Sequence, residues 1–330
     1  MSNLQTIRVR APASSANLGP GFDTLALALG LYLECTLRPS GPSGPSGSSG
    51  PSGPSGKGLS VRVAGTERAG IPPDATCLTW RAFLRLTGGN APPGADLEIA
   101  NDIPVGKGLG SSAAAIVAGL ALANEWANLG KSREELVQAA TEIEGHPDNV
   151  AAAVLGGFVV NCQTDGPADG SESGRVISLK QALGAQIEIV LVTPDFQLST
   201  SAARAALPVQ YSRQDSVFNV QRAALLVAAL AQGRTDLLRE AMRDRLHQPY
   251  RAPLIPGLQD ALELRDVPGL LGVALSGAGP SVVAFCSGHT EEVGAAIAAC
   301  FQARQIPARA RVLPVDNEGV VVERLNGSPP

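Results

Sequence analysis

The sequence predicts a protein of two domains that mixes strands with helices and carries a ligand-binding loop in its first half. At 330 residues the chain is long enough for two hydrophobic cores. A glycine-rich stretch at 102–116 runs directly into a strongly helical, apolar segment that ends near Asn128. The second half alternates buried strands and helices in a β-α-β-like order. We place the boundary between domains at 1–162 and 163–330.

The composition excludes several classes of protein. Apolar residues make up 44% of the chain and the mean hydropathy is +0.10, as is typical of a globular protein. No window of about 18 unbroken apolar residues predicts a membrane span, and the N-terminal stretch lacks the apolar core of a signal peptide. A net charge of −4 without a basic block argues against a nucleic-acid partner.

The cysteines and histidines argue against a disulfide framework and a zinc site. Five scattered cysteines without a C-x-x-C pair predict free thiols in a reducing compartment, and so a cytoplasmic protein. The three histidines lie far apart and form no H-E-x-x-H motif.

The first elements are expected to be strands. Residues 6–10 alternate and residues 24–36 are apolar, while the segment 11–23 between them is dense in turn formers and predicts a loop. Asn17 and Asp23 are the polar side chains of this loop that are long enough to contact a neighbouring group. Turn chemistry explains both, because these residue types bond their own backbone in Asx turns.

A repeat of Gly, Pro and Ser occupies residues 39–56, with glycine at every third position. It cannot bury apolar surface, so we expect a disordered insert. The insert interrupts a predicted strand pair, 31–37 with 59–64. A helix at 76–87 and a strand at 96–100 are predicted to follow.

The glycine-rich stretch predicts a phosphate site. Gly106, Gly108 and Gly110 alternate and are followed by two serines at the start of the helix. Glycine lets backbone N–H groups approach a ligand, and a helix start adds free donors and the positive end of the macrodipole. Together they favour an anion, most naturally phosphate. The competing interpretation is a glycine turn with Ser111 or Ser112 as an ordinary N-cap.

Three similar motifs do not fit. A Walker A loop fails because Glu125 stands where its first glycine belongs. The dinucleotide fingerprint matches residues 108–113, but the strand before it stops at Pro104 and no acidic residue ends a second buried strand. The protein-kinase glycine loop lacks its companion H-R-D and D-F-G motifs.

The next segments suggest a cation site. Ser132 and Glu135 form a capping box that opens a helix to about Glu144. A carboxylate at a helix C-terminus is unfavourable with the dipole, so Glu144 favours a metal cation as its counter-charge. Asp148 or Asn149 is a plausible N-cap for the alanine-rich helix that follows.

The second half predicts further strands and helices. A glycine turn around Gly277 and Gly279 is explained equally well by a tight hairpin. The expected elements are a strand at 187–193, helices at 217–232 and 236–246, a strand–turn–strand unit at 272–285, a helix at 291–304 and a last strand at 310–314 before a frayed tail.

Three motifs in order resemble the GHMP small-molecule kinases: residues 12–23, 104–114 and 275–281. Segments 144–149 and 249–251 agree as well, and the similarity spans nearly the whole chain. The forms S-A-N-L-G-P-G-F-D and E-G-H-P-D-N are similar to those of the members that phosphorylate L-homoserine. The resemblance implies an α+β fold with an N-terminal βαβ-type domain, a ferredoxin-like C-terminal domain and a site in the cleft between them.

The resemblance also implies an activity and a set of site residues. The activity is transfer of the γ-phosphoryl group of ATP to the L-homoserine hydroxyl in threonine biosynthesis, with Ser112 and Glu144 holding Mg²⁺. A homodimer is the family's usual state. The triphosphate would lie against Pro104, Val105, Gly106, Lys107, Gly108, Leu109, Gly110, Ser111, Ser112, Ala113 and Ala114. The substrate would lie against Asn17, Asp23, His146, Asn149, Arg204, Arg251 and Gly277.

The chemistry of a zwitterionic substrate agrees with that implied set. Arg204 and Arg251 can fork a carboxylate bidentately, and Asp23 can accept from the ammonium or from the reacting hydroxyl. Phosphoryl transfer depends on positioning and charge neutralisation, to which Lys107 or the arginines would contribute. Whether Asp23 also removes a proton stays open, because the segment 11–23 contains no lysine to pair with it.

Three other functions fit the sequence less well. A mevalonate-like alcohol lacks the ammonium group and would leave the acidic partner unexplained. A sensor that binds ATP and a small ligand without turnover predicts a broken catalytic set, whereas the glycine loop, Ser112 and Glu144 are all present. A glycine-rich scaffold without a ligand does not explain three motifs in order.

Overall fold

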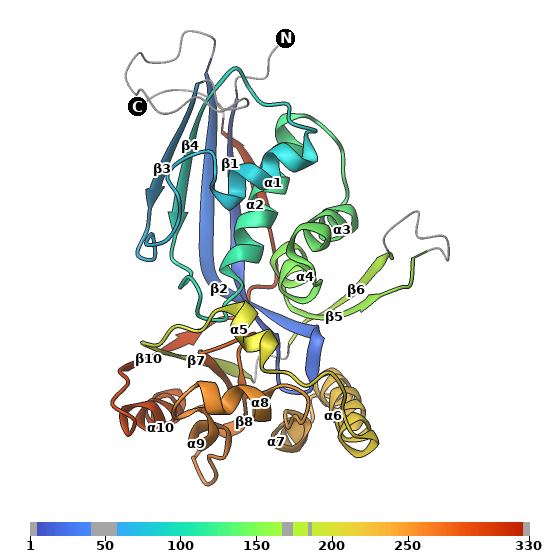
Figure 1. Ribbon diagram of the computed structural model, residues 1–330, viewed down its shortest axis with the longest axis vertical. Coiled ribbons are helices and arrows are strands. Elements are labelled where there is room, and N and C mark those ends of the chain that lie inside the picture. Colours follow the sequence, from blue (N-terminus) through green and yellow to red (C-terminus); the bar gives the residue numbers. More distant parts are fainter. Residues whose placement is uncertain (1–4, 41–57, 167–173, 184–186, 326–330) are drawn as a thin grey trace.

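The computed structural model describes residues 5–40, 58–166, 174–183 and 187–325. Within these residues the chain forms two sheets, each covered by helices (Figure 1). None of the helices in these ranges is long and apolar enough to cross a bilayer. Most of the predicted Gly/Pro/Ser insert, from residue 41 on, lies outside the described residues.

The first sheet has the order β11-β1-β2-β4-β3, and β5 and β6 extend it from β2. All of its pairs are antiparallel except β3 with β4. The 20-residue strand β2 pairs with β4 along its C-terminal part and with β5 along its N-terminal part. The strands are β1 (Thr6–Asn17), β2 (Gly21–Ser40), β3 (Leu59–Ala64), β4 (Gly94–Asn101), β5 (Phe158–Gln163), β6 (Val176–Gln181) and β11 (Val321–Leu325).

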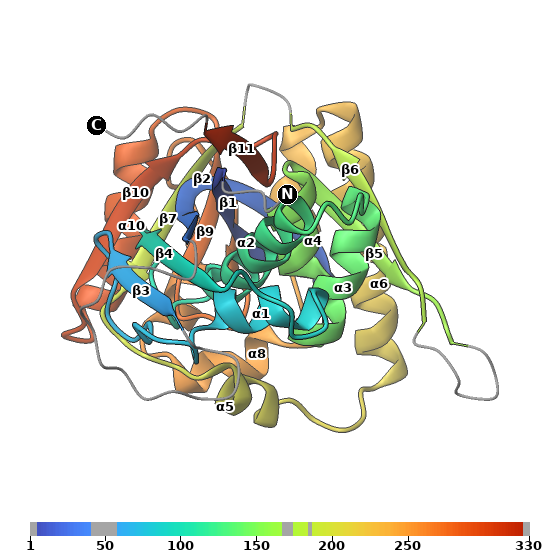
Figure 2. The ribbon, with the colours of Figure 1, turned by 90° about the horizontal axis from the view of Figure 1, so that it is seen from above.

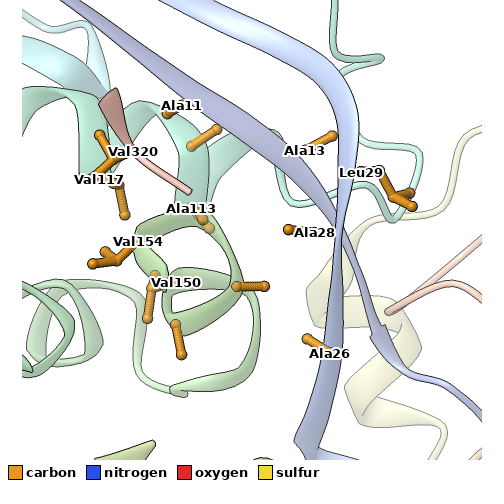
Figure 3. Close-up of a cluster of buried hydrophobic side chains, with 14 of the residues drawn as sticks. Ala11, Ala13, Ala26, Ala28, Leu29, Ala113, Val117, Val150, Val154 and Val320 are labelled. Atoms are coloured by element: carbon orange, nitrogen blue, oxygen red, sulfur yellow. The ribbon is translucent and has the colours of Figure 1, made fainter. Parts of the chain in front are cut away.

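Four helices gather on one face of this sheet (Figures 1 and 2). They are α1 (Leu78–Leu86), α2 (Ser111–Trp126), α3 (Arg133–Glu144) and α4 (Asp148–Leu155). The small side chains of α2 and α4 let both helices lie close to β1 and β2, as Ala11, Ala113 and Val150 illustrate (Figure 3). Close packing of this kind fixes the start of α2 relative to the sheet.

The second sheet has the order β10-β7-β9-β8, with all neighbours antiparallel. Counted within this half, the strands run fourth, first, third, second, which is the ferredoxin-like arrangement that the family resemblance implied. The strands are β7 (Glu188–Pro194), β8 (Leu270–Leu275), β9 (Val282–Cys286) and β10 (Ala308–Leu313). The helices are α5 (Thr200–Ala205), α6 (Arg213–Gln232), α7 (Leu238–Ala241), α8 (Gln248–Arg251), α9 (Leu258–Leu262) and α10 (Thr290–Gln302), with short 3₁₀ turns at Thr235–Leu237 and Ala252–Leu254.

Four expectations about elements were wrong. The predicted strand pair of 31–37 with 59–64 does not form, because β4 lies between β2 and β3 and pairs with both. The predicted loop 11–23 is mostly strand, because β1 continues to Asn17 and its Ala and Ser side chains fit the tightly packed pairing with β2. The predicted helix 236–246 ends at Ala241. The predicted frayed tail contains β11, which pairs with β1.

The division into domains at 1–162 and 163–330 stays a proposal. Two strands from beyond that boundary, β6 and β11, pair within the first sheet. The chain therefore crosses between the two halves more than once, and a cut in the sequence alone cannot separate the two sheets.

Candidate active site

The loop that connects β4 to α2, residues 104–110, is held by its carbonyl groups. The carbonyl of Leu109 accepts from the backbone N–H of Ser14 on β1 at 3.1 Å. Two further carbonyls accept from the turn between β8 and β9. The carbonyl of Lys107 accepts from the N–H of Ser281 at 3.2 Å, and the carbonyl of Gly108 accepts from the hydroxyl of Ser276 at 2.7 Å. Both halves of the molecule therefore fasten this glycine loop.

The N–H groups of the same segment remain available. Among the residues that the structure describes, no protein acceptor receives a hydrogen bond from a backbone N–H between Gly106 and Ala113. These donors include the first three of α2, where the positive end of the helix macrodipole adds to them. A loop with engaged acceptors and free donors is suited to an anion, and above all to phosphate.

A cavity of about 300 Å³ lies beside the glycine loop. Its lining is of two kinds, apolar and polar. The apolar part comes from the segment before α1 and from its neighbours, and includes Ile71, Pro72, Cys77, Leu78, Ile99 and Val105. The polar part includes Asn17, Asp23, Ser112, Glu144, His146, Asp148, Asn149, Arg204 and Arg251. The polar wall of the cavity therefore combines residues that are distant in sequence, such as Asn17 and Arg251.

Not every predicted residue of the glycine loop faces this cavity. Most of the segment from Val105 to Ser112 lines it, whereas Pro104, Ala113 and Ala114 are buried in the packing around it. The side chain of Lys107 also lies elsewhere. Its Nζ donates to the carbonyls of Pro194 at 3.1 Å and Phe196 at 2.8 Å, so in this structure its charge ties the loop to the end of β7.

Ser112 and Glu144 meet at the edge of the glycine loop. The hydroxyl of Ser112, in the first turn of α2, donates to Oε1 of Glu144 at 2.5 Å. Glu144 is the last residue of α3, which Gly145 ends in the left-handed conformation. A hydroxyl and a carboxylate beside a phosphate site are the oxygen ligands that Mg²⁺ takes in proteins, so the pair fits the ion that the sequence suggested.

Asp148 lines the cavity with a side chain that sequence reasoning treated only as an N-cap. Its buried carboxylate accepts from Nδ1 of His146 at 2.7 Å and from the backbone N–H of Asn149 at 2.6 Å. Burial alone would lower the pKa of His146. The hydrogen bond and the negative charge of Asp148, followed by the charges of Asp23 and Glu144, outweigh burial and raise that pKa above its ordinary value.

Asp23 and Arg204 form a bidentate pair across the cavity. The two guanidinium nitrogens donate to the two carboxylate oxygens at 2.9 and 3.1 Å. The arginine fork that was expected to hold a substrate carboxylate is therefore occupied by Asp23. Asn17 fixes the aspartate from behind, because its Oδ1 accepts from the backbone N–H of Asp23 at 3.1 Å.

Arg251 is a buried cation at the same cavity. Its Nη1 donates to the carbonyl of Gly277 at 3.0 Å and contacts Nδ1 of His247 at 3.2 Å, while Nε lies 3.3 Å from the carbonyl of Ala203. Burial, followed by the charge of Arg204, lowers the pKa of Arg251 to about 10. An anionic partner would relieve both effects.

The segment before α1 is the part of the site that sequence reasoning missed. Ile71, Pro72, Cys77, Leu78 and Thr79 line the cavity, yet no local motif distinguishes them from an ordinary turn and helix start. Only the packing of α1 against α2 brings them to the glycine loop. They supply the apolar surface that a planar ring system could contact.

Comparisons with known proteins agree along the whole chain. Family models described as the GHMP kinases N terminal domain and the GHMP kinases C terminal match residues 76–157 and 226–303. A homoserine kinase of Solibacter usitatus is 46% identical over 86% of each chain. One of Desulfitobacterium hafniense is 41% identical over 96% of this chain and 99% of its own.

Solved structures give the same result. The crystal structure of homoserine kinase from Cytophaga hutchinsonii superposes with a TM-score of 0.80 at 29% identity, covering 98% of this chain and 99% of that one. A Leishmania major mevalonate kinase at 18% identity, with a TM-score of 0.66, shares the fold.

Replacing Gly108 with alanine should weaken MgATP binding at least tenfold and lower the thermal midpoint. Its φ is +77°, and a Cβ would lie 2.2 Å from the carbonyl oxygen of Ser276. Gly130 is the matched control because it lies outside the cavity lining, with φ +64° and no atom within 4 Å of a Cβ, so G130A carries only the left-handed strain of about 1–2 kcal/mol. Isothermal titration and thermal unfolding of both variants would test this, and equal losses would contradict it.

The pKa of His146 should lie above its ordinary value and should fall in the variant Asp148→Asn. Because the folded-state pKa is raised, protonated His146 stabilises the fold below the unfolded-state pKa, and this contribution is lost as pH rises through the folded-state pKa. In D148N only the charges of Asp23 and Glu144 are left to oppose burial, so the pKa of His146 should fall. NMR titration of the imidazole would measure both values, with the surface variant Glu292→Gln as control; an unchanged pKa in D148N would refute the assignment.

Proposed function

This chain belongs to the GHMP kinase family and, within it, to the homoserine kinases, and we propose that it transfers the γ-phosphoryl group of ATP to the side-chain hydroxyl of L-homoserine. The product would be O-phospho-L-homoserine, an intermediate of threonine biosynthesis. One observation carries the proposal: within the described part of the chain, the N–H donors of the glycine loop have no protein acceptor, and the loop lines a cavity that also holds a buried cation and a carboxylate–guanidinium pair.

The nucleotide would lie along the glycine loop. The free N–H groups between Gly106 and Ala113 suit a triphosphate, and the apolar residues before α1 suit the base. Ser112 and Glu144 would hold Mg²⁺, which supplies charge neutralisation for the phosphates when it is bound. Because phosphoryl transfer is dominated by positioning and electrostatics, these residues would account for much of the catalysis.

The substrate would exchange partners with an existing ion pair. Asp23 and Arg204 neutralise each other in this structure, and a zwitterion offers a new partner to each. The homoserine carboxylate would pair with Arg204 and with the buried Arg251, while Asp23 would accept from the ammonium or from the reacting hydroxyl. The exchange keeps every charge in the site compensated. Asn17, His146, Asn149 and Gly277 would complete the substrate side.

Two further properties stay predictions. The homodimer follows from the family resemblance. The cytoplasmic location was predicted from the cysteines, and all five lack a disulfide partner in the structure.

ADP release should require L-homoserine. In a coupled assay with MgATP and homoserine, mevalonate or shikimate supplied separately, we expect turnover with homoserine alone, because only this alcohol carries both the ammonium and the carboxylate. Turnover with mevalonate would show that the protein is a different kinase of the family. No turnover with any of the three would favour a sensor.

Replacing Glu144 with glutamine should raise the Mg²⁺ concentration for half-maximal rate at least tenfold, because a neutral amide is a poorer ligand than a carboxylate. Glu142→Gln is the matched control, since Glu142 is exposed on the same helix, two residues earlier. The rate would be measured against Mg²⁺ at fixed ATP. An identical Mg²⁺ dependence in E144Q and E142Q would remove Glu144 from the metal site.

A further inference from the structure

We propose that Ser14 is a positioning residue for this reaction: it holds the side-chain amide of Asn149 so that an N–H group is presented to the cavity. The inference rests on the proposed function, because such a donor matters only if a transferring phosphoryl group or a reacting hydroxyl binds beside it. Ser14 itself does not line the cavity.

The first observation is a buried hydrogen bond between distant elements. Ser14 lies on β1 and is fully buried, and Asn149 lies in the first turn of α4 at the cavity wall. The hydroxyl of Ser14 donates to Oδ1 of Asn149 at 2.8 Å. This bond determines which end of the amide faces β1.

The neighbouring carboxylate selects the same orientation. Nδ2 of Asn149 lies 3.3 Å from Oδ1 of Asp148, and a carboxylate can only accept. A flipped amide would set the oxygen of Asn149 against the oxygen of Asp148 with no proton between them. Ser14 and Asp148 therefore fix the amide from both sides, and one proton of Nδ2 is left for the cavity.

Ser14 also sets the distance between this amide and the glycine loop. Its backbone N–H holds the carbonyl of Leu109 at 3.1 Å. Its hydroxyl occupies the space beside Gly110, where a Cβ would lie 2.1 Å from Oγ of Ser14 and 3.0 Å from Oδ1 of Asn149. One residue thus positions both the glycine loop and the amide, and both line the same cavity.

The loss of the hydroxyl should affect turnover more than binding. Without it, the buried Oδ1 of Asn149 loses the donor that holds it, and the amide can rotate away from the cavity. A donor aimed at the transferring group acts most strongly where charge develops in the transition state, so kcat should change while the two KM values change little.

The test is a double-mutant cycle between Ser14→Ala and Asn149→Ala, read out as kcat with homoserine and MgATP. S14A should lower kcat by about 10-fold to 100-fold and change each KM by less than about threefold. In the N149A background S14A should have no further effect on kcat, because the group that it positions is gone. Ser15→Ala is the matched control: this buried hydroxyl on the same strand has no partner among the described residues, and its loss should leave kcat unchanged.

Several results would overturn the inference. One is a wild-type kcat in S14A. Another is a decrease in kcat caused by S14A that is equally large in the wild-type protein and in N149A. If S14A does not fold, as thermal unfolding would reveal, Asn149→Asp replaces it: this variant keeps the acceptor for Ser14 but removes the N–H, so a wild-type kcat in N149D would refute the proposal. An inactive wild-type protein would instead refute the proposed function, so the two failures are distinguishable.

Discussion

Three consecutive carbonyl groups of the glycine loop, those of Lys107, Gly108 and Leu109, accept hydrogen bonds from backbone and hydroxyl donors, and the rest of the site depends on that constraint. The loop is bonded to β1 on one side and to the β8–β9 turn on the other, with Lys107 as a third connection to the end of β7. Because its acceptors are engaged, the loop cannot satisfy its own N–H groups by folding back on itself. The donors are therefore organised before any ligand arrives, which reduces the entropy lost on binding.

The polar wall of the cavity is built from pairs that compensate one another. Asp23 faces Arg204, Asp148 faces His146, and Glu144 accepts from Ser112. Burying a single charge is costly, whereas a paired one is tolerated, so this arrangement keeps the site stable while it is empty of substrate. Arg251 is the exception, since its described partners are carbonyls and a histidine, and it is the group with the most to gain from an anion.

Local signals in the sequence predicted local features well. The alternating glycines before α2, the capping box of Ser132 and Glu135, and the long helix α6 all appear as expected. Features that depend on distant partners were missed. The strand character of residues 11–17 comes from pairing with β2, and the pair of Asp23 with Arg204 joins positions 181 residues apart. Asp148 is a residue type that is common at helix starts, so the sequence indicated only an N-cap. Its contact with the side chain of His146 becomes visible only in the structure.

The pairing of β11 with β1 has a consequence for biogenesis. Thr6 lies opposite Leu325 and Arg10 opposite Val321, so the outer side of β1 is covered by a strand that leaves the ribosome some 300 residues later. Until then a nascent chain exposes an open strand edge beside a largely formed sheet, which is the kind of surface that invites intermolecular pairing.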